Sequence, residues 1–391
     1  MEPGWSVWSF LKGNQAGIML RFALRFISYD KPKSIGVILG IVISIFLVGQ
    51  QTGIFLFLTG AMSSLVNNTK ADIWVVDNRT TNVNALGPID IRIGYQIESL
   101  PGVKKAYPLV IAGGSAKFRD GKSAPVQIIG SLPPSFRGGP WNIVKGSLDN
   151  LIDEGAVSSD VFDKKNLNNA DLGTQFEING KRVIISVQTR GVRSFGGIFI
   201  FTTDSRAREL GKIPKNKVSA FLIDVEEGAD PLAIRDYINR TLFGVRAWTK
   251  KEFSRATVST ILSTSGIAFS IGTLIIFAAI SGMIIIGLTM YSAAVDRLRD
   301  YGTLKAIGAD NTYIRNLILT QAIFFALTGY GIAIILIQGF QRGIANSGVL
   351  FNYSTAIKIA FFIVTILISL GGAAFAMHRI ARLEPASVFR A

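Results

Sequence analysis

The apolar run IGVILGIVISIFLVGQQTGIFLFL, residues 35–58, decides the fold class, because no Asp, Glu, Lys or Arg interrupts it. A helix needs about 20 apolar residues to cross the roughly 30 Å hydrocarbon core of a membrane. Three later runs meet the same criterion, at residues 267–290, 317–337 and 359–377. The sequence therefore predicts an α-helical integral membrane protein with four transmembrane helices.

The first run is too long for the core of a signal peptide, and no small-x-small cleavage site follows it. We therefore expect it to be retained as a transmembrane helix. The roughly 200 residues before the second run have the composition and length of an ordinary soluble domain. This segment predicts one large mixed α/β extracytoplasmic domain between helices 1 and 2.

Within that domain, β-branched and aromatic residues predict strands at 71–77, 124–130, 176–187, 198–202 and 218–225. Asn179-Gly180 is typical of a two-residue hairpin turn. Helical patterns are expected at 157–167 and 231–242, and a loop at 131–146.

Lys and Arg in short loops predict which ends of the helices face the cytoplasm. The basic residues of the leader, of the loop after the second run and of the tail are Lys12, Arg21, Arg25, Lys31, Lys33, Arg297, Arg299, Lys305, Arg315, Arg379, Arg382 and Arg390. The loop between the last two runs has only Arg342, with Lys358 at the start of the fourth run. We expect a multi-pass protein of the bacterial cytoplasmic membrane, with both termini in the cytoplasm and the large domain in the periplasm.

These observations divide the chain into nine predicted segments. They are a cytoplasmic amphipathic leader (1–34), transmembrane helix 1 (35–60), the extracytoplasmic domain (61–266), helix 2 (267–291), a cytoplasmic coupling loop (292–316), helix 3 (317–338), a short external loop (339–358), helix 4 (359–377) and a cytoplasmic tail (378–391). The leader either lies in the membrane interface or packs on the protein, and its pattern fits both arrangements.

Composition disfavours several functions. The net charge of +15 comes in part from the short segments that set topology and face anionic lipid, which argues against a nucleic-acid partner. The chain has no Cys and one His, so thiolate and histidine-based metal sites are not expected. Asp120-Gly121-Lys122-Ser123 resembles the end of a phosphate-binding loop, but Ala116 stands where that motif needs Gly. We interpret this segment as a hairpin turn and predict no cofactor or ATP site on this chain.

Small residues four apart allow membrane helices to approach closely. The first helix has two such pairs, Gly36/Gly40 and Gly49/Gly53, which helical geometry places on opposite sides. Two close-packing faces predict two neighbours, one in the same subunit and one in a second copy. The common occurrence of Gly in membrane helices is the alternative explanation. Gln50 and Gln51 lie in the same apolar run, where we expect one amide to bond to a neighbouring helix or, less simply, to a substrate.

The loop after the second run carries an apolar residue at every third position. These residues are Val295, Leu298, Tyr301, Leu304 and Ile307, with Arg297, Arg299, Asp300 and Lys305 mostly off the stripe. Gly308 is expected to end this helix and Asp310 to cap the next. The pattern predicts an amphipathic helix that offers its apolar face to a cytoplasmic partner.

The segment Asp300-Tyr-Gly-Thr-Leu-Lys-Ala-Ile-Gly-Ala309 resembles the E-I-G-x-L-R-A-I-G-A segment of the MacB, LolE and FtsX superfamily of ABC transporter membrane subunits. The two agree at eight of ten positions when Asp for Glu and Lys for Arg are counted as matches. The tail Ala381-Arg-Leu-Glu-Pro385 is similar to that family's A-R-L-D/E-P ending, although Ser387-Val388 departs from the usual continuation. The external segment 71–77 looks closest to the DevC-type exporter permeases. The resemblance covers the whole chain in architecture.

The resemblance implies a mechanotransmission (type VII) transporter of two membrane subunits and two cytoplasmic ATPases, with ATP and Mg bound by the ATPases. Leu298, Tyr301, Leu304, Lys305, Ile307 and Gly308 would couple to the ATPase. The expected cargo is a lipid, glycolipid, lipopeptide or hydrophobic compound, passed to a periplasmic adaptor and an outer-membrane channel. The alternative is an FtsX-like signalling subunit that activates a cell-wall hydrolase. The predicted spans contain no acidic residue and no His, which disfavours a membrane-embedded enzyme.

Overall fold

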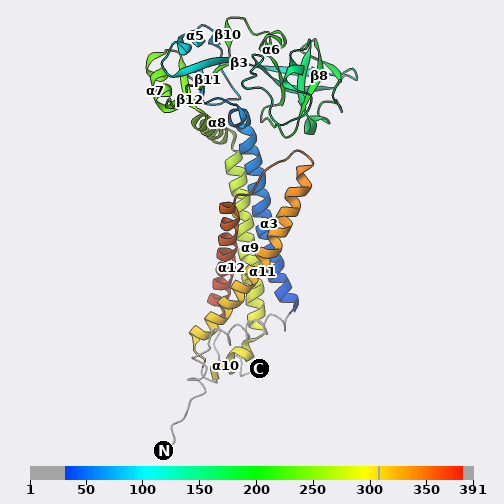
Figure 1. Ribbon diagram of the computed structural model, residues 1–391. Coiled ribbons are helices and arrows are strands. Elements are labelled where there is room, and N and C mark those ends of the chain that lie inside the picture. Colours follow the sequence, from blue (N-terminus) through cyan, green and yellow to red (C-terminus); the bar gives the residue numbers. More distant parts are fainter. Residues whose placement is uncertain (1–30, 307–308, 382–391) are drawn as a thin grey trace, which may run out of the picture. The chain divides into compact units, whose positions relative to one another are not determined.

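Four long apolar helices form one unit of the computed structural model, which describes residues 31–306 and 309–381 of the chain. They are α3 (Lys31–Met62), α9 (Ile267–Val295), α11 (Asn311–Ala345) and α12 (Thr355–Ala381), and each contains one of the predicted runs. All four are long and apolar enough to cross a membrane. They run side by side in Figure 1, which confirms the predicted membrane fold. The leader up to residue 30 and the tail from residue 382 lie outside the described residues.

Close helix contacts in this unit are made at glycines, because only a residue without Cβ lets two backbones approach so closely. A Cβ at Gly329 of α11 would lie 2.5 Å from Ile41 of α3, and one at Gly372 of α12 would lie 2.7 Å from Ile286 of α9. The Ser369 hydroxyl of α12 also donates a 2.7 Å hydrogen bond to the Ala322 carbonyl of α11. The outer sides of the helices expose large apolar side chains, as expected for surfaces that face lipid.

The second unit contains residues 56–268 together with 344–350. Its ten-stranded sheet has the order β12-β1-β11-β3-β7-β8-β5, with β4, β9 and β6 attached to β3, β4 and β8. The strands are β1 (Ile73–Asp77), β3 (Val103–Lys117), β4 (Ser123–Ser131), β5 (Ile143–Lys145), β6 (Ala156–Asp160), β7 (Gln175–Ile178), β8 (Lys181–Thr189), β9 (Ile198–Thr203), β11 (Ala220–Val225) and β12 (Val245–Thr249). A separate short pair joins β2 (Ile89–Asp90) to β10 (Lys217–Val218).

The long strand β3 joins the two halves of this sheet, because its first part pairs with β11 and its last part with β4 and β7. Short helices cover the sheet. They are α4 (Ser64–Asn68), α5 (Ile93–Glu98), α6 (Asp204–Gly211), α7 (Pro231–Thr241) and α8 (Lys250–Ser265), with the 3-10 turns η1 (Leu148–Leu151) and η2 (Val161–Asp163). Buried apolar side chains of these helices and of the strands pack together in three hydrophobic clusters. The result is the predicted mixed α/β domain between the first two membrane helices.

Most local predictions for this domain are confirmed. The strands expected at 71–77, 124–130, 198–202 and 218–225 match β1, β4, β9 and β11, and Asn179-Gly180 forms the turn between β7 and β8. Residues 120–121 turn the chain between β3 and β4, with the Phe118 amide bonded to the Lys122 carbonyl at 3.0 Å. The helix predicted at 157–167 is wrong: residues 156–160 form the buried strand β6, which pairs with β8.

Candidate functional site

The loop that follows α9 contains the helix α10 (Leu298–Ala306). The turn between α9 and α10 is held by hydrogen bonds from the Arg297 amide to the Ala294 carbonyl, at 3.2 Å, and from the Tyr301 amide to the Arg297 carbonyl, at 3.0 Å. Asp310 accepts a 2.7 Å bond from the Tyr313 amide and so caps α11, as predicted. Ile307 and Gly308, both assigned to the coupling site from sequence, lie outside the described residues.

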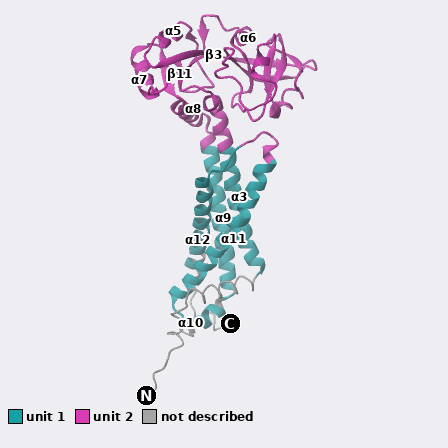
Figure 2. Cartoon of the chain, viewed as in Figure 1, with its two compact units in different colours: residues 1–55, 269–343, 351–391 teal, residues 56–268, 344–350 magenta. Residues whose placement is uncertain are grey.

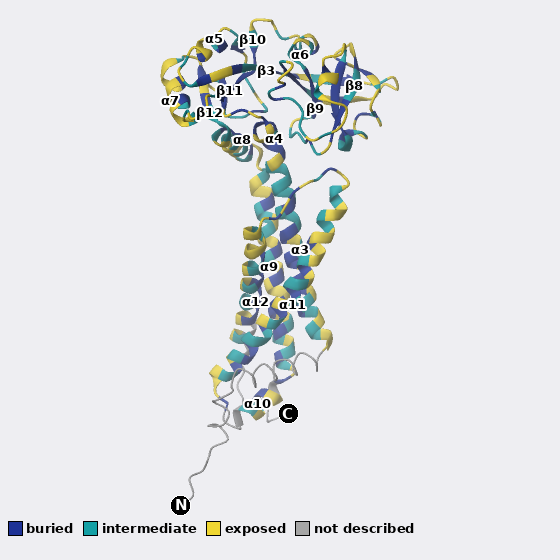
Figure 3. Ribbon diagram, viewed as in Figure 1, coloured by how far each residue is buried: buried dark blue, intermediate teal, exposed yellow. Residues whose placement is uncertain are grey.

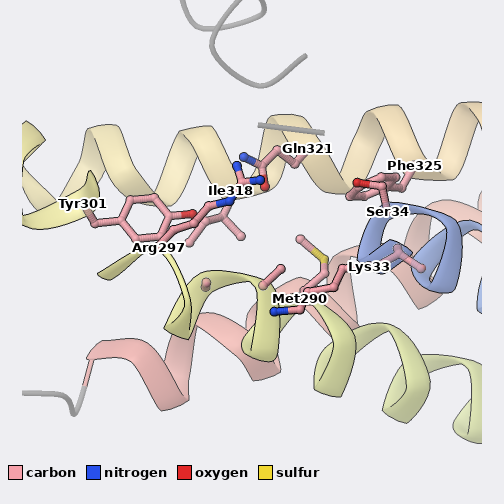
Figure 4. A pocket seen from close by; sticks show the side chains of 11 residues that line it. Lys33, Ser34, Met290, Arg297, Tyr301, Ile318, Gln321 and Phe325 are labelled. Atoms are coloured by element: carbon pink, nitrogen blue, oxygen red, sulfur yellow. The ribbon is translucent and has the colours of Figure 1, made fainter. Parts of the chain in front are cut away.

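A cavity of about 30 Å³ lies between α10 and three helices of the bundle. Its walls are Lys33, Ser34 and Val37 of α3, Met290, Ala293 and Ala294 of α9, Arg297, Tyr301 of α10, and Ile318, Gln321 and Phe325 of α11. A site of this size has room for about two water molecules. Figure 4 shows Arg297 and Tyr301 reaching towards Gln321 across it. Side chains of the α10 region and of α3, α9 and α11 therefore line the same cavity.

Arg297 and Tyr301 are buried side chains of the α10 region. Arg297 is 9% exposed and Tyr301 is 6% exposed. Burial raises the pKa of the Tyr301 hydroxyl to about 12, since it disfavours the phenolate, and Arg297 opposes this shift while Asp300 adds to it. The hydroxyl therefore stays protonated at physiological pH and remains a hydrogen-bond donor.

Lys33, in the first turn of α3, contacts residues at the C-terminal end of α9. Its ammonium group forms an ion pair with Asp296 and lies 3.4 Å from the Ser292 carbonyl. The Lys33 side chain is 25% exposed and the Asp296 side chain is 59% exposed, so this is a partly solvated pair. A cation near the last carbonyls of a helix also interacts favourably with the helix dipole.

Gln321 brings a polar group from α11 to the cavity. Its Nε2 atom is buried and has no hydrogen-bond partner among the described residues. A buried unpaired amide donor costs about 1–3 kcal/mol. Sequence reasoning did not single out Gln321, although an amide within an apolar run was the signal that drew attention to Gln50 and Gln51.

The apolar stripe predicted for α10 is only partly a free surface. Tyr301 faces the cavity inside the bundle and Leu304 is half-buried, and a role of Tyr301 in coupling to the ATPase stays a prediction. Among the α10 residues whose burial is described, the exposed ones are Arg299, Asp300 and Thr303. The backbone of Leu298 and Lys305 is helical, and a partner contact through these two residues stays a prediction. The described outward face of α10 is therefore mainly polar.

The glycine pairs of α3 pack against helices and loops of the same chain. A Cβ at Gly36 would lie 3.5 Å from Thr289, and one at Gly40 would lie 2.7 Å from Ile285, both on α9. On the other half of α3, Gly49 packs against Ile337 of α11, and Gly53 against the rings of Phe351 and Tyr353. Both faces are thus occupied within one subunit. The predicted packing of α3 against helices of its own subunit fits this arrangement, and a contact of these glycines with a second copy stays a prediction.

Gln50 and Gln51 do not make the interhelical bond expected for one of them. Both side chains are half-buried, and neither forms a hydrogen bond with another residue of the described ranges. The polar contact at this level is instead made by Tyr353, whose hydroxyl reaches the Gly49 carbonyl. A tyrosine in the short loop before α12 gave no sequence signal for this role.

Two family models match the chain. The MacB-like periplasmic core domain matches residues 34–241, and the FtsX-like permease C-terminal model matches residues 272–385. The first model alone covers more than half of the chain. This chain belongs to the MacB/FtsX family of ABC transporter permeases.

Individual proteins resemble this permease at low identity. An ABC transporter permease of Mycobacterium tuberculosis, described as uncharacterized in strains H37Rv and CDC 1551, is 25% identical over 95% of this chain and 99% of its own length. The periplasmic region of MacB from Actinobacillus actinomycetemcomitans is 10% identical, with a TM-score of 0.37 over 51% of this chain and 98% of that structure. The extracellular domain of YknZ, a noncanonic ABC-type transporter from Gram-positive bacteria, is 11% identical, with a TM-score of 0.33 over 46% of this chain and 98% of that structure.

Family membership sets the broad role of the permease. In this family ATP hydrolysis lies on a separate ATPase subunit, so an ABC ATPase is the implied partner and assembly with a second permease copy is expected. The membrane helices and the MacB-like domain make it an inner-membrane protein with a periplasmic domain.

Proposed function

We propose that this permease is the membrane subunit of an ABC exporter and that α10 receives the movement of its ATPase through Arg299, Asp300 and Thr303. The observation that carries the proposal is that neighbouring residues of α10 differ in burial. Tyr301 is buried in the bundle, whereas Arg299, Asp300 and Thr303 are exposed. A partner bound to the exposed face would move the buried Tyr301 side chain with it.

The remaining parts of the proposal follow from the family and from the charge pattern. Both termini and α10 face the cytoplasm, where the ATPases bind ATP and Mg. Two permease copies and two ATPases form the complex. The cargo is a lipid-like, glycolipid, lipopeptide or other hydrophobic substrate that a periplasmic adaptor passes to an outer-membrane channel. The basic residues near α10 and in the leader support this orientation.

Charge reversal on α10 tests the docking face. Arg299→Glu and Asp300→Lys place the wrong charge opposite the partner, and like charges at an interface cost several kcal/mol. A penalty of about 3 kcal/mol lowers association roughly a hundredfold, at about 1.4 kcal/mol for each factor of ten. The measurement is copurification of the ATPase at matched membrane abundance. Leu304→Asp tests the half-buried apolar side of the same helix.

Arg342→Glu is the matched control, because Arg342 is an exposed arginine in the last turn of α11 and far along the chain from α10. It should leave ATPase capture unchanged. Wild-type capture by Arg299→Glu, Asp300→Lys and Leu304→Asp together would exclude α10 as the docking element.

A further inference from the structure

The connection between α11 and α12 contains a segment that belongs to the external unit. Residues 344–350 group with residues 56–268, and we name them the strap. Gly348 has φ of +80°, and a Cβ at this position would lie 2.7 Å from Phe162 Cβ. Leu350 Cδ1 lies 2.8 Å from the position of a Cβ on Gly191. Gly348 and the Leu350 side chain of the strap are therefore in direct contact with two segments of the domain.

Asp160 holds these two segments together. Its buried carboxylate accepts hydrogen bonds from the Phe162 amide at 3.0 Å and from the Val192 amide at 2.8 Å. It also accepts a 3.0 Å bond from the Thr189 hydroxyl. The Arg190 guanidinium lies 5.1 Å from the Phe162 ring centroid, within the range of a cation–π interaction. The strap thus contacts a surface of the domain whose segments are held together by several polar contacts.

The same surface is tied to the helix that continues the chain after α3. The Ser64 hydroxyl, in the first turn of α4, donates a 2.5 Å hydrogen bond to the Arg193 carbonyl. The Arg193 guanidinium in turn pairs with Asp163 at 2.7 Å. Residues 189–193 therefore receive contacts from two parts of the chain that lead into the membrane helices: α4 after α3, and the strap between α11 and α12.

The residues that follow the strap are fixed in the helical unit. Phe351 is 9% exposed, and its carbonyl accepts a 2.6 Å hydrogen bond from Gln341 of α11. Tyr353 is bonded to Gly49 of α3 at 2.7 Å. Leu350 and Phe351 are consecutive in the chain, so one peptide bond joins the strap to the first residue of the segment that belongs to the helical unit.

We propose that the strap is a second coupling element, which transmits displacement of α11 and α12 to residues 160–163 and 189–193 of the external domain. Gly348 and Leu350 are positioning residues in this proposal. This proposal rests on the proposed function in one respect: the ATPase causes the displacement of α11 and α12. The route through α3 and α8 then acts together with the strap on the same domain.

The contact is tested first on the full-length permease alone, by hydrogen exchange in detergent. Gly348→Ala introduces a Cβ against Phe162 at a backbone conformation that favours Gly, and Leu350→Ala removes the contact with Gly191. Both should speed amide exchange in peptides covering 160–163 and 189–193 about fivefold or more, while α7 is unchanged. Gly343→Ala is the control, since no atom lies within 4 Å of its Cβ position. Wild-type exchange in both variants would overturn the proposal.

Coupling is tested in the complex with the copurifying ATPase. ATP with vanadate should change exchange of residues 189–193 in the wild-type complex, and Leu350→Ala should lose at least half of this change while it still captures the ATPase. A full ATP-dependent change in Leu350→Ala would overturn the strap as a coupling element. Absence of ATPase capture by the wild-type protein would instead contradict the proposed function, so the two failures are distinguishable.

Discussion

The Tyr353 hydroxyl donates a 2.7 Å hydrogen bond to the backbone carbonyl of Gly49, and this bond joins the loop before α12 to the middle of α3. Tyr353 is 7% exposed and packs edge-on against Phe351 and Phe361. Its hydroxyl oxygen also lies 2.6 Å from the position that a Cβ would take on Gly53. The two glycines thus admit an aromatic cluster that larger residues would displace.

Alanine at these glycines should destabilise the permease. A Cβ at Gly49 would collide with Ile337, and one at Gly53 would lie 2.6 Å from both Phe351 and Tyr353. Overpacking of this kind costs about 1–3 kcal/mol. Gly60→Ala is the control on the same helix, because nothing lies within 4 Å of its Cβ position, and it should be neutral or slightly stabilising. Thermal unfolding in detergent, followed by size-exclusion chromatography, measures the difference; equal melting temperatures for Gly49→Ala, Gly53→Ala and Gly60→Ala would contradict the packing.

Removal of the unpaired amide of Gln321 should stabilise the bundle. Gln321→Leu deletes a buried donor that has no partner in the described part of the chain, and we expect a gain of about 1 kcal/mol in the free energy of unfolding. Gln338→Leu, at an exposed position of the same helix, should have little effect. If Gln321→Leu is instead less stable than the wild type, the amide makes an essential hydrogen bond, for example through water in the cavity.

The ion pair between Lys33 and Asp296 should show a measurable coupling. Lys33→Asp and Asp296→Lys each place two like charges together, and the double variant restores opposite charges. Because the pair is partly exposed, we expect it to contribute about 0.2–1 kcal/mol to the free energy of unfolding, and this contribution should fall with added salt. A double-mutant cycle on thermal stability measures the coupling, which also includes the like-charge repulsions that the single reversals introduce. Additive effects of the two reversals would mean that the pair contributes nothing to stability.

The sequence predicts the membrane helices well because each is a long run without charge, as in residues 35–58. Strands such as β11 follow from β-branched and aromatic residues. The helix expected at 157–167 fails because Asp160, Asp163 and their neighbours are polar residues buried by specific partners, which a local pattern does not reveal. The long strand β3 was missed, since Pro108, Gly113 and Gly114 interrupt its pattern.

The α10 site shows the same limit. An apolar residue at every third position predicts that one face of the helix is buried. It does not predict whether that face packs against the same chain or against a partner. Tyr301 packs into its own bundle, and the pattern alone is equally compatible with a groove on another protein. The cavity also depends on Lys33 and Gln321, which are 288 positions apart in sequence and meet only through the packing of α3 and α11.

The orientation of the chain is open to a direct test, because the absence of cysteine makes every introduced thiol unique. Glu227→Cys lies in the exposed turn between β11 and α7, and Thr303→Cys lies on the exposed face of α10. A membrane-impermeant maleimide added to intact spheroplasts should label Glu227→Cys and leave Thr303→Cys unlabelled.

Permeabilisation with detergent is the control for accessibility, since it should expose Thr303→Cys to the same reagent. The expectation rests on Lys and Arg of short loops, which are retained in the cytoplasm during insertion, and on the concentration of these residues next to α10. Labelling of Thr303→Cys from outside, with Glu227→Cys protected, would reverse the orientation. In that case α10 would face away from the cytoplasmic ATPase and the proposed docking through Arg299, Asp300 and Thr303 would be impossible, whatever the effect of those substitutions on stability.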